Sequence, residues 1–483
     1  MTAIMIQGTG SDVGKSLVVA GLCRAFVRRG ISVAPFKPQN MSNNAAITAC
    51  GGEIGRAQAL QARASRLEPT VDMNPVLLKP ESDQGAQIVV QGRVFGHSNA
   101  STFGEHGPQL MTAVRQSFGR LRAQYDLVVV EGAGSASEVN LRDRDIANMG
   151  FAEAEQVPVV LLGDIDRGGV IASVVGTHTV ISLSDRAHIV GYIINKFRGN
   201  VALFEPALDI IEGHTGWPSF GILPWLRDAA LLPEEDATSA RVRATLATEN
   251  LRIAVPMLSR IANFDDLDPL AQHPGVDVSF VPPGDVLPEC EVVVIPGTKN
   301  TRADLAFMRA NGWDIDIAAH HRRGGEVVGL CGGYQMLGHQ VDDPDGIEDV
   351  AGSSVGLGLL NVHSRLDARK TTRQMSGSDV RFGMPLTGYE LHAGQTSGPD
   401  TERAVGRFAG HHEGATTADG RVWGTYLHGI FGNDDFRTSW LADRVQAAPQ
   451  ERRYALQVED ALDAIADSME THLDIDGLLA AAG

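Results

Sequence analysis

The chain has 483 residues, too many for one hydrophobic core, so we expect at least two domains. Hydrophobic residues make up 43% of it and charged residues 21%, which is typical of an ordinary globular protein. The formal net charge of -18 argues against nucleic acid as a partner, because nucleic-acid binders usually carry a basic surface.

The sequence also predicts a soluble, cytoplasmic protein with no membrane partner. Its first residues, MTAIMIQGTG, lack the basic start and long apolar run of a signal peptide. No stretch approaches the roughly 18 uninterrupted apolar residues of a membrane span. Cys23, Cys50, Cys290 and Cys331 lie far apart, which is typical of a reduced compartment and of a chain without structural zinc. The oligomeric state does not follow from these features.

Apolar, strand-like segments alternate with helical patterns in the first half of the chain. Val18, Leu22 and Phe26 recur every fourth residue, which predicts a helix that ends near Gly30. Near-continuous apolar strands are typical of sheets buried on both faces, so we expect a parallel sheet with helices on both sides. The predicted strands cover 3–7, 31–35, 88–91, 127–132, 157–166 and 188–195.

The alternation stops near residue 227, where a polar, acidic stretch predicts a linker or a bridging helix. It resumes at 251–258 and continues through glycine-rich, strand-like segments. One or two amphipathic helices packed on the surface are expected at the C-terminus. The predicted division is an N-terminal α/β domain (1–230), a linker (231–250), a second α/β domain (251–445) and a C-terminal helical tail (446–483).

Residues 8–16, GTGSDVGKS, lie between a predicted strand and a predicted helix, the context that a phosphate-binding loop requires. Lys15 is expected to reach the outer phosphates of a nucleotide, and Ser16 to hold Mg²⁺. The standard phosphate-loop motif has its first glycine at position 9, where this chain has Thr9 with a glycine on either side. The weaker alternative is a glycine-rich turn with an incidental lysine. The predicted ATP-binding residues of this loop are Thr9, Gly10, Asp12, Val13, Gly14, Lys15 and Ser16.

A carboxylate follows the buried strand in LVVVEGAGS, where such folds hold a metal, so Glu131 is a candidate Mg²⁺ ligand beside Ser16. Asp12, inside the loop, is a second candidate, acting directly or through water. The alternatives are an ordinary acid at a strand end for Glu131 and an ordinary loop acid for Asp12.

The segment GLCGG sets Cys331 on a predicted strand-to-helix turn between small residues, which a projecting nucleophile needs. The following helix N-terminus favours the thiolate, and the backbone N–H of Gly332 would face a developing oxyanion. Gly297 or Thr298, after the strand EVVVI, would supply the other donor. A general base is still required, and His428 follows another strand-like segment. Cys23, within its helix, is expected to be an inert packing residue.

Gly-x-Cys-x-Gly with a later histidine resembles the class I, or triad-type, glutamine amidotransferases. The phosphate loop with E-G-A-G resembles dethiobiotin-synthetase-like ATP-dependent enzymes. The cobyrinic and cobyric acid amidases of the vitamin B12 pathway join these two parts in this order, and nearly the whole chain is similar to the branch that forms cobyric acid. The matching stretches are 34–45, 51–62, 73–92, 131–152, 164–170, 194–200, 296–305 and 424–431.

This resemblance implies that Cys331 attacks glutamine and that His428 is its base. The usual third member of the triad is a glutamate two residues after the histidine, where this chain has Ile430. What orients His428 is therefore open, with Glu390 and His392 as candidates. In related synthetase domains the asparagine of I-N-K reads adenine, which implies that role for Asn195.

The resemblance also implies a corrinoid substrate, adenosylcobyrinic acid a,c-diamide, whose b, d, e and g carboxylates are amidated with ATP, Mg²⁺ and glutamine as ammonia donor. Such a polyanion needs cationic and amide partners near strand ends. The candidates, any of which is equally well an ordinary surface charge or helix cap, are Lys37, Gln39, Asn40, Lys79, Asp145, Asp166 and Arg167.

Three other functions share part of this pattern. The nearest is the sister enzyme that amidates the a and c carboxylates of cobyrinic acid, which has both motifs. A ligase that uses free ammonia fits less well, because Cys331 and His428 are both present. A partner-switching ATPase that positions cellular cargo has no need for a cysteine turn.

Overall fold

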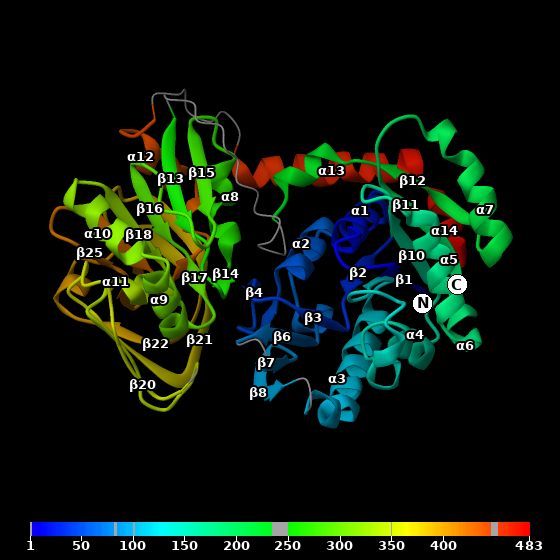
Figure 1. The fold of residues 1–483 in the computed structure, drawn as a ribbon, viewed down its shortest axis with the longest axis horizontal. Helices are drawn as coiled ribbons and strands as arrows, with labels where there is room; N and C mark the ends of the chain where they lie inside the picture. Colours follow the sequence, from blue (N-terminus) through cyan, green and yellow to red (C-terminus); the bar gives the residue numbers. More distant parts are fainter. Residues whose placement is uncertain (1, 82–84, 100–101, 234–249, 349, 446–452) are drawn as a thin grey trace.

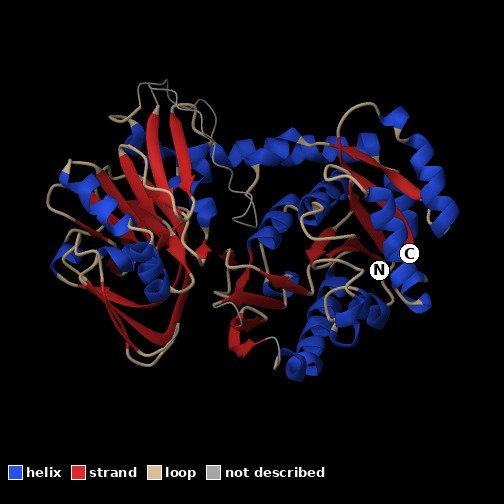
Figure 2. Cartoon of the chain, viewed as in Figure 1, coloured by secondary structure: helices blue, strands red, loops and turns tan. Residues whose placement is uncertain are grey.

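The computed structural model describes residues 2–81, 85–99, 102–233, 250–348, 350–445 and 453–483. Two α/β halves lie side by side, the N-terminal one in blue to cyan-green and the second in green to orange (Figure 1). In each half, strands form the centre and helices cover them (Figure 2). This agrees with the fold class expected from the alternating pattern.

The N-terminal half is built on a parallel sheet with the strand order β12-β11-β10-β1-β9-β2. Ala3 and Met5 of β1 pack on one face of this sheet, whereas Ile4 and Ile6 pack on the other. The strands are β1 (Thr2–Gly8), β2 (Val33–Phe36), β9 (Leu127–Glu131), β10 (Val159–Asp164), β11 (Ile189–Phe197) and β12 (Ser219–Pro224). The helices are α1 (Lys15–Arg28), α2 (Arg56–Ala64), α3 (Phe103–Gln124), α4 (Met149–Glu155), α5 (Val170–Val180), α6 (Leu183–Arg186) and α7 (Glu205–Thr215).

The predicted strand at 88–91 does not join the parallel sheet. It lies in β7, which pairs antiparallel with β6 and β8 in a separate small sheet that faces the second half. A short apolar run fits a hairpin as well as a buried parallel strand, which is why the pattern alone misplaced it. The elements of this region are β3 (Gln39–Met41), β4 (Ala45–Ile47), β5 (Glu53–Gly55), β6 (Val76–Pro80), β7 (Gly85–Val90) and β8 (Arg93–Asn99).

The second half has a sheet of order β15-β13-β16-β18-β26-β25, parallel except for its last pair. A second, largely antiparallel layer runs β20-β19-β21-β22-β27 and carries the long hairpin of β21 and β22. The strands of the two layers are β13 (Leu251–Pro256), β15 (Val276–Val281), β16 (Val292–Ile295), β18 (Glu326–Leu330), β19 (Gln340–Asp343), β20 (Gly352–Val355), β21 (His363–Asp379), β22 (Pro385–Ser397), β23 (Gly406–Phe408), β24 (His411–Glu413), β25 (Ala415–Thr416), β26 (Val422–Thr425) and β27 (Leu427–His428). A separate antiparallel pair is formed by β14 (Ile261–Ala262) and β17 (Gly297–Thr298). The helices are α8 (Asp268–Ala271), α9 (Thr301–Ala310), α10 (Trp313–Arg322), α11 (Gly332–Leu337) and α12 (Asp434–Leu441).

The C-terminal helices α13 (Tyr454–His472) and α14 (Ile475–Ala481) return to the N-terminal half. Helix α13 crosses from the second half to the first along the upper edge of the molecule (Figure 1). Its apolar side, including Leu462 and Ile465, is fully buried in the same core as helix α1. Arg24 of α1, also buried, pairs with Glu459 at 2.5 Å. The tail therefore completes the core of the N-terminal half instead of lying on its surface.

The two halves are joined by ion pairs as well as by the chain. Lys370 of β21 lies 2.5 Å from Glu53 of β5, and Lys299 lies 2.7 Å from Glu81. Burial raises the pKa of Glu53, but Lys370 and then Lys79 outweigh this effect and hold the pKa at about 2. Of the predicted linker, residues 234–249 lie outside the described residues, as do 446–452 of the predicted tail. The domain bounds stay a prediction.

Candidate active sites

The phosphate loop follows β1 and leads into α1, as its sequence predicts. Gly14 has φ 94°, and a Cβ atom there would lie 2.5 Å from Nδ2 of Asn195, so only glycine fits this position. A Cβ at Gly8 would approach the carbonyl oxygen of Gly10 to 2.7 Å. Gly8 therefore makes the close backbone approach that the strict phosphate-loop motif expects of a glycine one position later, where this chain has Thr9. Asn195, which is buried, donates to the carbonyl oxygen of Val13 and so braces the loop at the end of β11.

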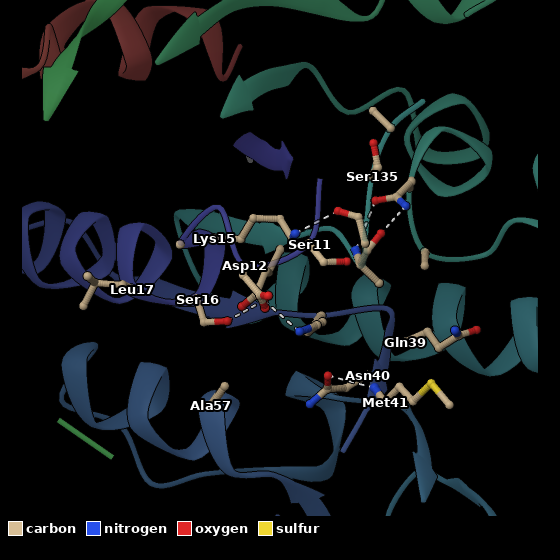
Figure 3. A pocket seen from close by; sticks show the side chains of 18 of the residues that line it. Ser11, Asp12, Lys15, Ser16, Leu17, Gln39, Asn40, Met41, Ala57 and Ser135 are labelled. Atoms are coloured by element: carbon tan, nitrogen blue, oxygen red, sulfur yellow. Dashed lines mark hydrogen bonds and ion pairs between the residues drawn. The ribbon is translucent and has the colours of Figure 1, made fainter. Parts of the chain in front are cut away.

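Lys15 and Ser16 lie side by side in a large cleft (Figure 3), which Glu131, at the end of strand β9, also lines. The Lys15 ammonium donates to the carbonyl oxygens of Gly134 and Gly10 at 2.8 and 3.1 Å. The Ser16 hydroxyl donates to Oε1 of Glu131 at 2.8 Å. These contacts hold the loop side chains above the sheet edge, where a nucleotide phosphate would lie.

The environment of Glu131 keeps it ionised. It is almost fully buried, which by itself raises its pKa, but Lys37 at 2.7 Å and hydrogen bonds from Gln61 and Ser16 outweigh burial and lower the pKa. An ionised carboxylate at this strand end is the kind of oxygen ligand that a divalent cation prefers.

Ser16 and Glu131 fit a magnesium ion. Mg²⁺ prefers oxygen ligands, needs only one or two from the protein and takes the rest from phosphate and water. A hydroxyl and an ionised carboxylate within 2.8 Å of each other meet that need. Asp12 is exposed instead and lies 3.6 Å from Arg167, so its role as a ligand stays a prediction.

The predicted corrinoid residues separate into two groups. Lys37, Gln39, Asn40, Asp145, Asp166 and Arg167 all line a large cleft of about 1460 Å³ that also holds Lys15 and Glu131. Lys79 lies elsewhere: it pairs with Glu53 at 3.1 Å and lines a smaller cavity of about 310 Å³ with Cys331. Asp145 accepts three backbone N–H bonds, from Ala147, Asn148 and Gly150. These bonds give it a structural role in holding the turn that it begins.

Cys331 connects strand β18 to helix α11 with φ 51° and ψ -110°. Such a conformation is strained for a residue with a side chain and typical of a nucleophile held on a sharp turn. A Cβ at Gly333 would lie 2.1 Å from the carbonyl oxygen of Ile295, and one at Gly329 would lie 2.7 Å from that of Gly333. Both glycines flanking the turn are therefore required by close backbone approach.

Gly332, Gly297 and Thr298 surround the turn, as expected for oxyanion donors. The Cβ position of Gly332 lies 3.2 Å from the backbone nitrogen of Thr298. That of Gly297 lies 3.7 Å from Cβ of Cys331 and 3.6 Å from Cε1 of His428. The hydroxyl of Thr298 is bonded to the buried Asp304, which fixes this segment. The geometry is compatible with the predicted oxyanion role.

His428 is held by a carboxylate that the sequence patterns did not indicate. Its Nδ1 lies 2.7 Å from Oδ2 of Asp266, whose other oxygen accepts the backbone N–H of Gly429 at 2.6 Å. The ring also stacks on Tyr389, with centroids 5.2 Å apart. Burial lowers the pKa of His428, but Asp266 and the neighbouring Cys331 sulfur outweigh it and raise the pKa to about 10. Asp266 thus holds Nδ1 of the imidazole, and Nε2 has no hydrogen-bond partner among the described residues.

Glu390 and His392, the candidates named for this role, have other partners. Glu390 pairs with Arg373 at 2.6 Å, and His392 stacks on Tyr426 with centroids 3.7 Å apart. Asp266 lies in the turn ANFDDLDP after the first strand of the second half, 162 positions before His428. The only signal in the sequence is an acidic pair at a strand end, which is too common to single out.

Part of the chain matches two family models. Residues 4–239 match the CobQ/CobB/MinD/ParA nucleotide binding domain, and residues 252–436 match the CobB/CobQ-like glutamine amidotransferase domain.

No helix in the described part of the chain is long and apolar enough to cross a membrane.

Curated relatives match the chain from end to end. The cobyric acid synthase of Cereibacter sphaeroides is 58% identical over 483 residues and that of Paracoccus denitrificans is 57% identical over the same length, each with full coverage of both chains. The cobyric acid synthase of Bradyrhizobium diazoefficiens is 56% identical over 481 residues, 99% of each chain. With a phosphate loop in one half and a Cys–His–Asp site in the other, the chain belongs to the cobyric acid synthase family, whose members are glutamine amidotransferase ligases.

Proposed function

We propose that the protein converts adenosylcobyrinic acid a,c-diamide to adenosylcobyric acid by amidating the b, d, e and g carboxylates. ATP activates each carboxylate, and glutamine supplies the ammonia. The proposal combines the family membership with the two sites of this chain. It is carried by one observation: the phosphate-loop cleft and the Cys331 cavity adjoin the same short segment of chain, residues 39–43.

In the glutaminase site, the Cys331 sulfur attacks the side-chain amide of glutamine while Gly332 and Thr298 stabilise the oxyanion. His428, oriented by Asp266, passes a proton to the leaving nitrogen, so ammonia departs and a thioester remains. His428 then takes a proton from water as it attacks the thioester, which releases glutamate and restores the thiol.

In the synthetase site, a substrate carboxylate oxygen attacks the terminal phosphorus of ATP, so ADP leaves and the carboxylate becomes an acyl phosphate. Lys15 and the backbone of residues 10–16 stabilise the charge on that group. Attack by ammonia then forms the amide and releases phosphate. Ser16 and Glu131 are the proposed Mg²⁺ ligands, and the ion would neutralise phosphate charge when bound.

The arrangement of the cavities supports a protected route for ammonia. Gln39, Asn40 and Met41 line the large cleft, whereas Asn43, two residues further on, lines the smaller cavity with Cys331 and His428. Both cavities are lined by residues of both halves. We propose that ammonia crosses this segment, which would keep it from bulk water, where protonation would remove its nucleophilicity.

Mass spectrometry of the corrinoid after incubation with the protein, Mg-ATP and glutamine tests the proposal. We expect stepwise gain of four amides, loss of this reaction in Cys331→Ala and its recovery with added ammonia. Cys290→Ala, a partly buried cysteine outside both cavities, is the matched control and should behave as wild type. Turnover of cobyrinic acid with no reaction of the a,c-diamide would transfer the proposal to the sister reaction. ATP hydrolysis without amidation of either substrate would refute both.

A further inference from the structure

Helix α2 of the N-terminal half begins at the glutaminase site of the second half. Its first residue, Arg56, places a guanidinium nitrogen 2.6 Å from Oδ2 of Asp265. Asp265 is buried, and it directly precedes Asp266, the carboxylate that holds His428. Arg56, which belongs to the nucleotide-binding half, therefore contacts the sequence neighbour of the residue that holds the imidazole.

The two adjacent carboxylates need a cation to remain in place. Asp265 and Asp266 are each about 4% exposed, and burial of an acid next to another acid is costly unless a cation compensates it. Burial raises the pKa of Asp265, and Arg56 opposes that effect most strongly. Without Arg56, the short helix that carries both acids, η6 (Phe264–Leu267), would lose the ion-pair partner of Asp265 and leave His428 as the cation beside the two acids.

The same turn has a second anchor in the N-terminal half. The side-chain oxygen of Asn263 accepts the backbone N–H of Ala45 at 2.9 Å, and its own backbone N–H donates to Asn44 at 2.6 Å. Tyr389, which stacks on His428, donates its hydroxyl to the carbonyl oxygen of Ala45 at 3.0 Å. Contacts from the first half thus surround the element that positions the histidine.

We propose that Arg56 is a positioning residue for glutamine hydrolysis, supplied by the nucleotide-binding half. It fixes Asp265, so that the neighbouring Asp266 keeps its bond to Nδ1 of His428. This inference rests on the proposed glutaminase role of Cys331 and His428. Glutamine hydrolysis would then require a residue outside the amidotransferase half. That residue lies on helix α2, whose Gln61 also bonds Glu131 of the nucleotide site.

The experiment measures glutamate release from glutamine, and separately amide formation with added ammonia, in four variants of the full chain. Arg56→Met removes the cation, and Arg56→Lys keeps it. Arg56→Met with Asp265→Asn removes both charges together. Arg63→Met is the matched control, because Arg63 lies on the same helix but pairs with Glu459 of α13 at 2.7 Å.

We expect Arg56→Met to lower kcat for glutamate release by about 10- to 100-fold, with little change in KM, because a misplaced base slows the reaction without weakening binding. Ammonia-dependent amidation should stay near wild type, which also shows that the variant folds. Arg56→Lys and the double variant should each recover most of kcat, and Arg63→Met should lose none.

Three results would overturn the inference while leaving the proposed function intact: unchanged kcat in Arg56→Met, equal loss of the glutamine- and ammonia-dependent reactions, or no recovery in the double variant. Failure of the proposed function looks different, since the wild-type chain itself would then release no glutamate or amidate no corrinoid.

Discussion

Asp266 and His428 lie 162 positions apart in the sequence, and Oδ2 of the one is 2.7 Å from Nδ1 of the other. The family motif places the third triad member two residues after the histidine, where this chain has Ile430. Asp266 supplies the same kind of contact from a different element. With Cys331 in the same cavity as His428, these residues form the proposed triad, although the sequence position that usually supplies its acid holds Ile430.

We expect Asp266→Asn to lower kcat for glutamate release by at least about 100-fold, because the imidazole loses both its orientation and the charge that favours its protonated form. The pKa of His428 should fall from about 10 toward 6.5, which NMR of labelled histidine can follow. Glu390→Gln is the control, since Glu390 is equally buried but pairs with Arg373. A retained pKa near 10 in Asp266→Asn would show that another group holds the proton.

The raised pKa of His428 also predicts how stability depends on pH. Its folded value of about 10 lies above its ordinary value of 6.5. The protonated histidine therefore stabilises the fold fully below pH 6.5, and this contribution is lost as the pH rises to about 10. Urea unfolding of wild type and His428→Gln should show a difference in stability that shrinks from pH 6.5 to 10. A difference that stays constant over this range would contradict the assignment.

Much of this architecture follows from local patterns in the sequence. The apolar runs around 3–7 and 127–132 predict parallel strands, and the glycines around Lys15 and Cys331 predict tight turns. The structure has both features, because strand burial and backbone strain depend on nearby residues. The strand at 88–91 was assigned to the wrong sheet, since its apolar run does not specify its partner.

Contacts between distant segments could not be predicted from the sequence. Asp266 and Arg56 lie in common-looking acidic and helical stretches. The packing of the second half brings Asp266 to His428, and the docking of the two halves brings Arg56 to Asp265. Lys79 is another case: it lies in a stretch like those of the cleft residues, but it pairs with Glu53 and lines the cavity of Cys331. Such relationships depend on tertiary packing, which no local pattern encodes.

Lys15→Met separates the two reactions. Removing the ammonium takes away a charge that stabilises the transferring phosphoryl group, so ATP-dependent amidation should fall by at least about 100-fold even with added ammonia. Glutamate release should persist, because Lys15 lines the large cleft and is not among the residues that line the Cys331 cavity. Measuring both products in one incubation checks this. Persistent amidation by Lys15→Met would show that the phosphoryl group is held by other residues.

Helix α13 gives a last prediction, because it belongs to the core of the N-terminal half. Leu462→Ala removes a fully buried side chain from the face that packs on α1, which should cost about 2–5 kcal/mol. Leu456→Ala on the same helix, where 55% of the residue is exposed, is the matched control and should cost much less. Hydrogen exchange locates the effect: β1 and α1 should lose protection in Leu462→Ala while β16 and β18 keep theirs. Equal loss in both halves would mean that α13 stabilises the whole chain through their interface, and no loss in β1 would mean that the N-terminal half folds without its C-terminal helices.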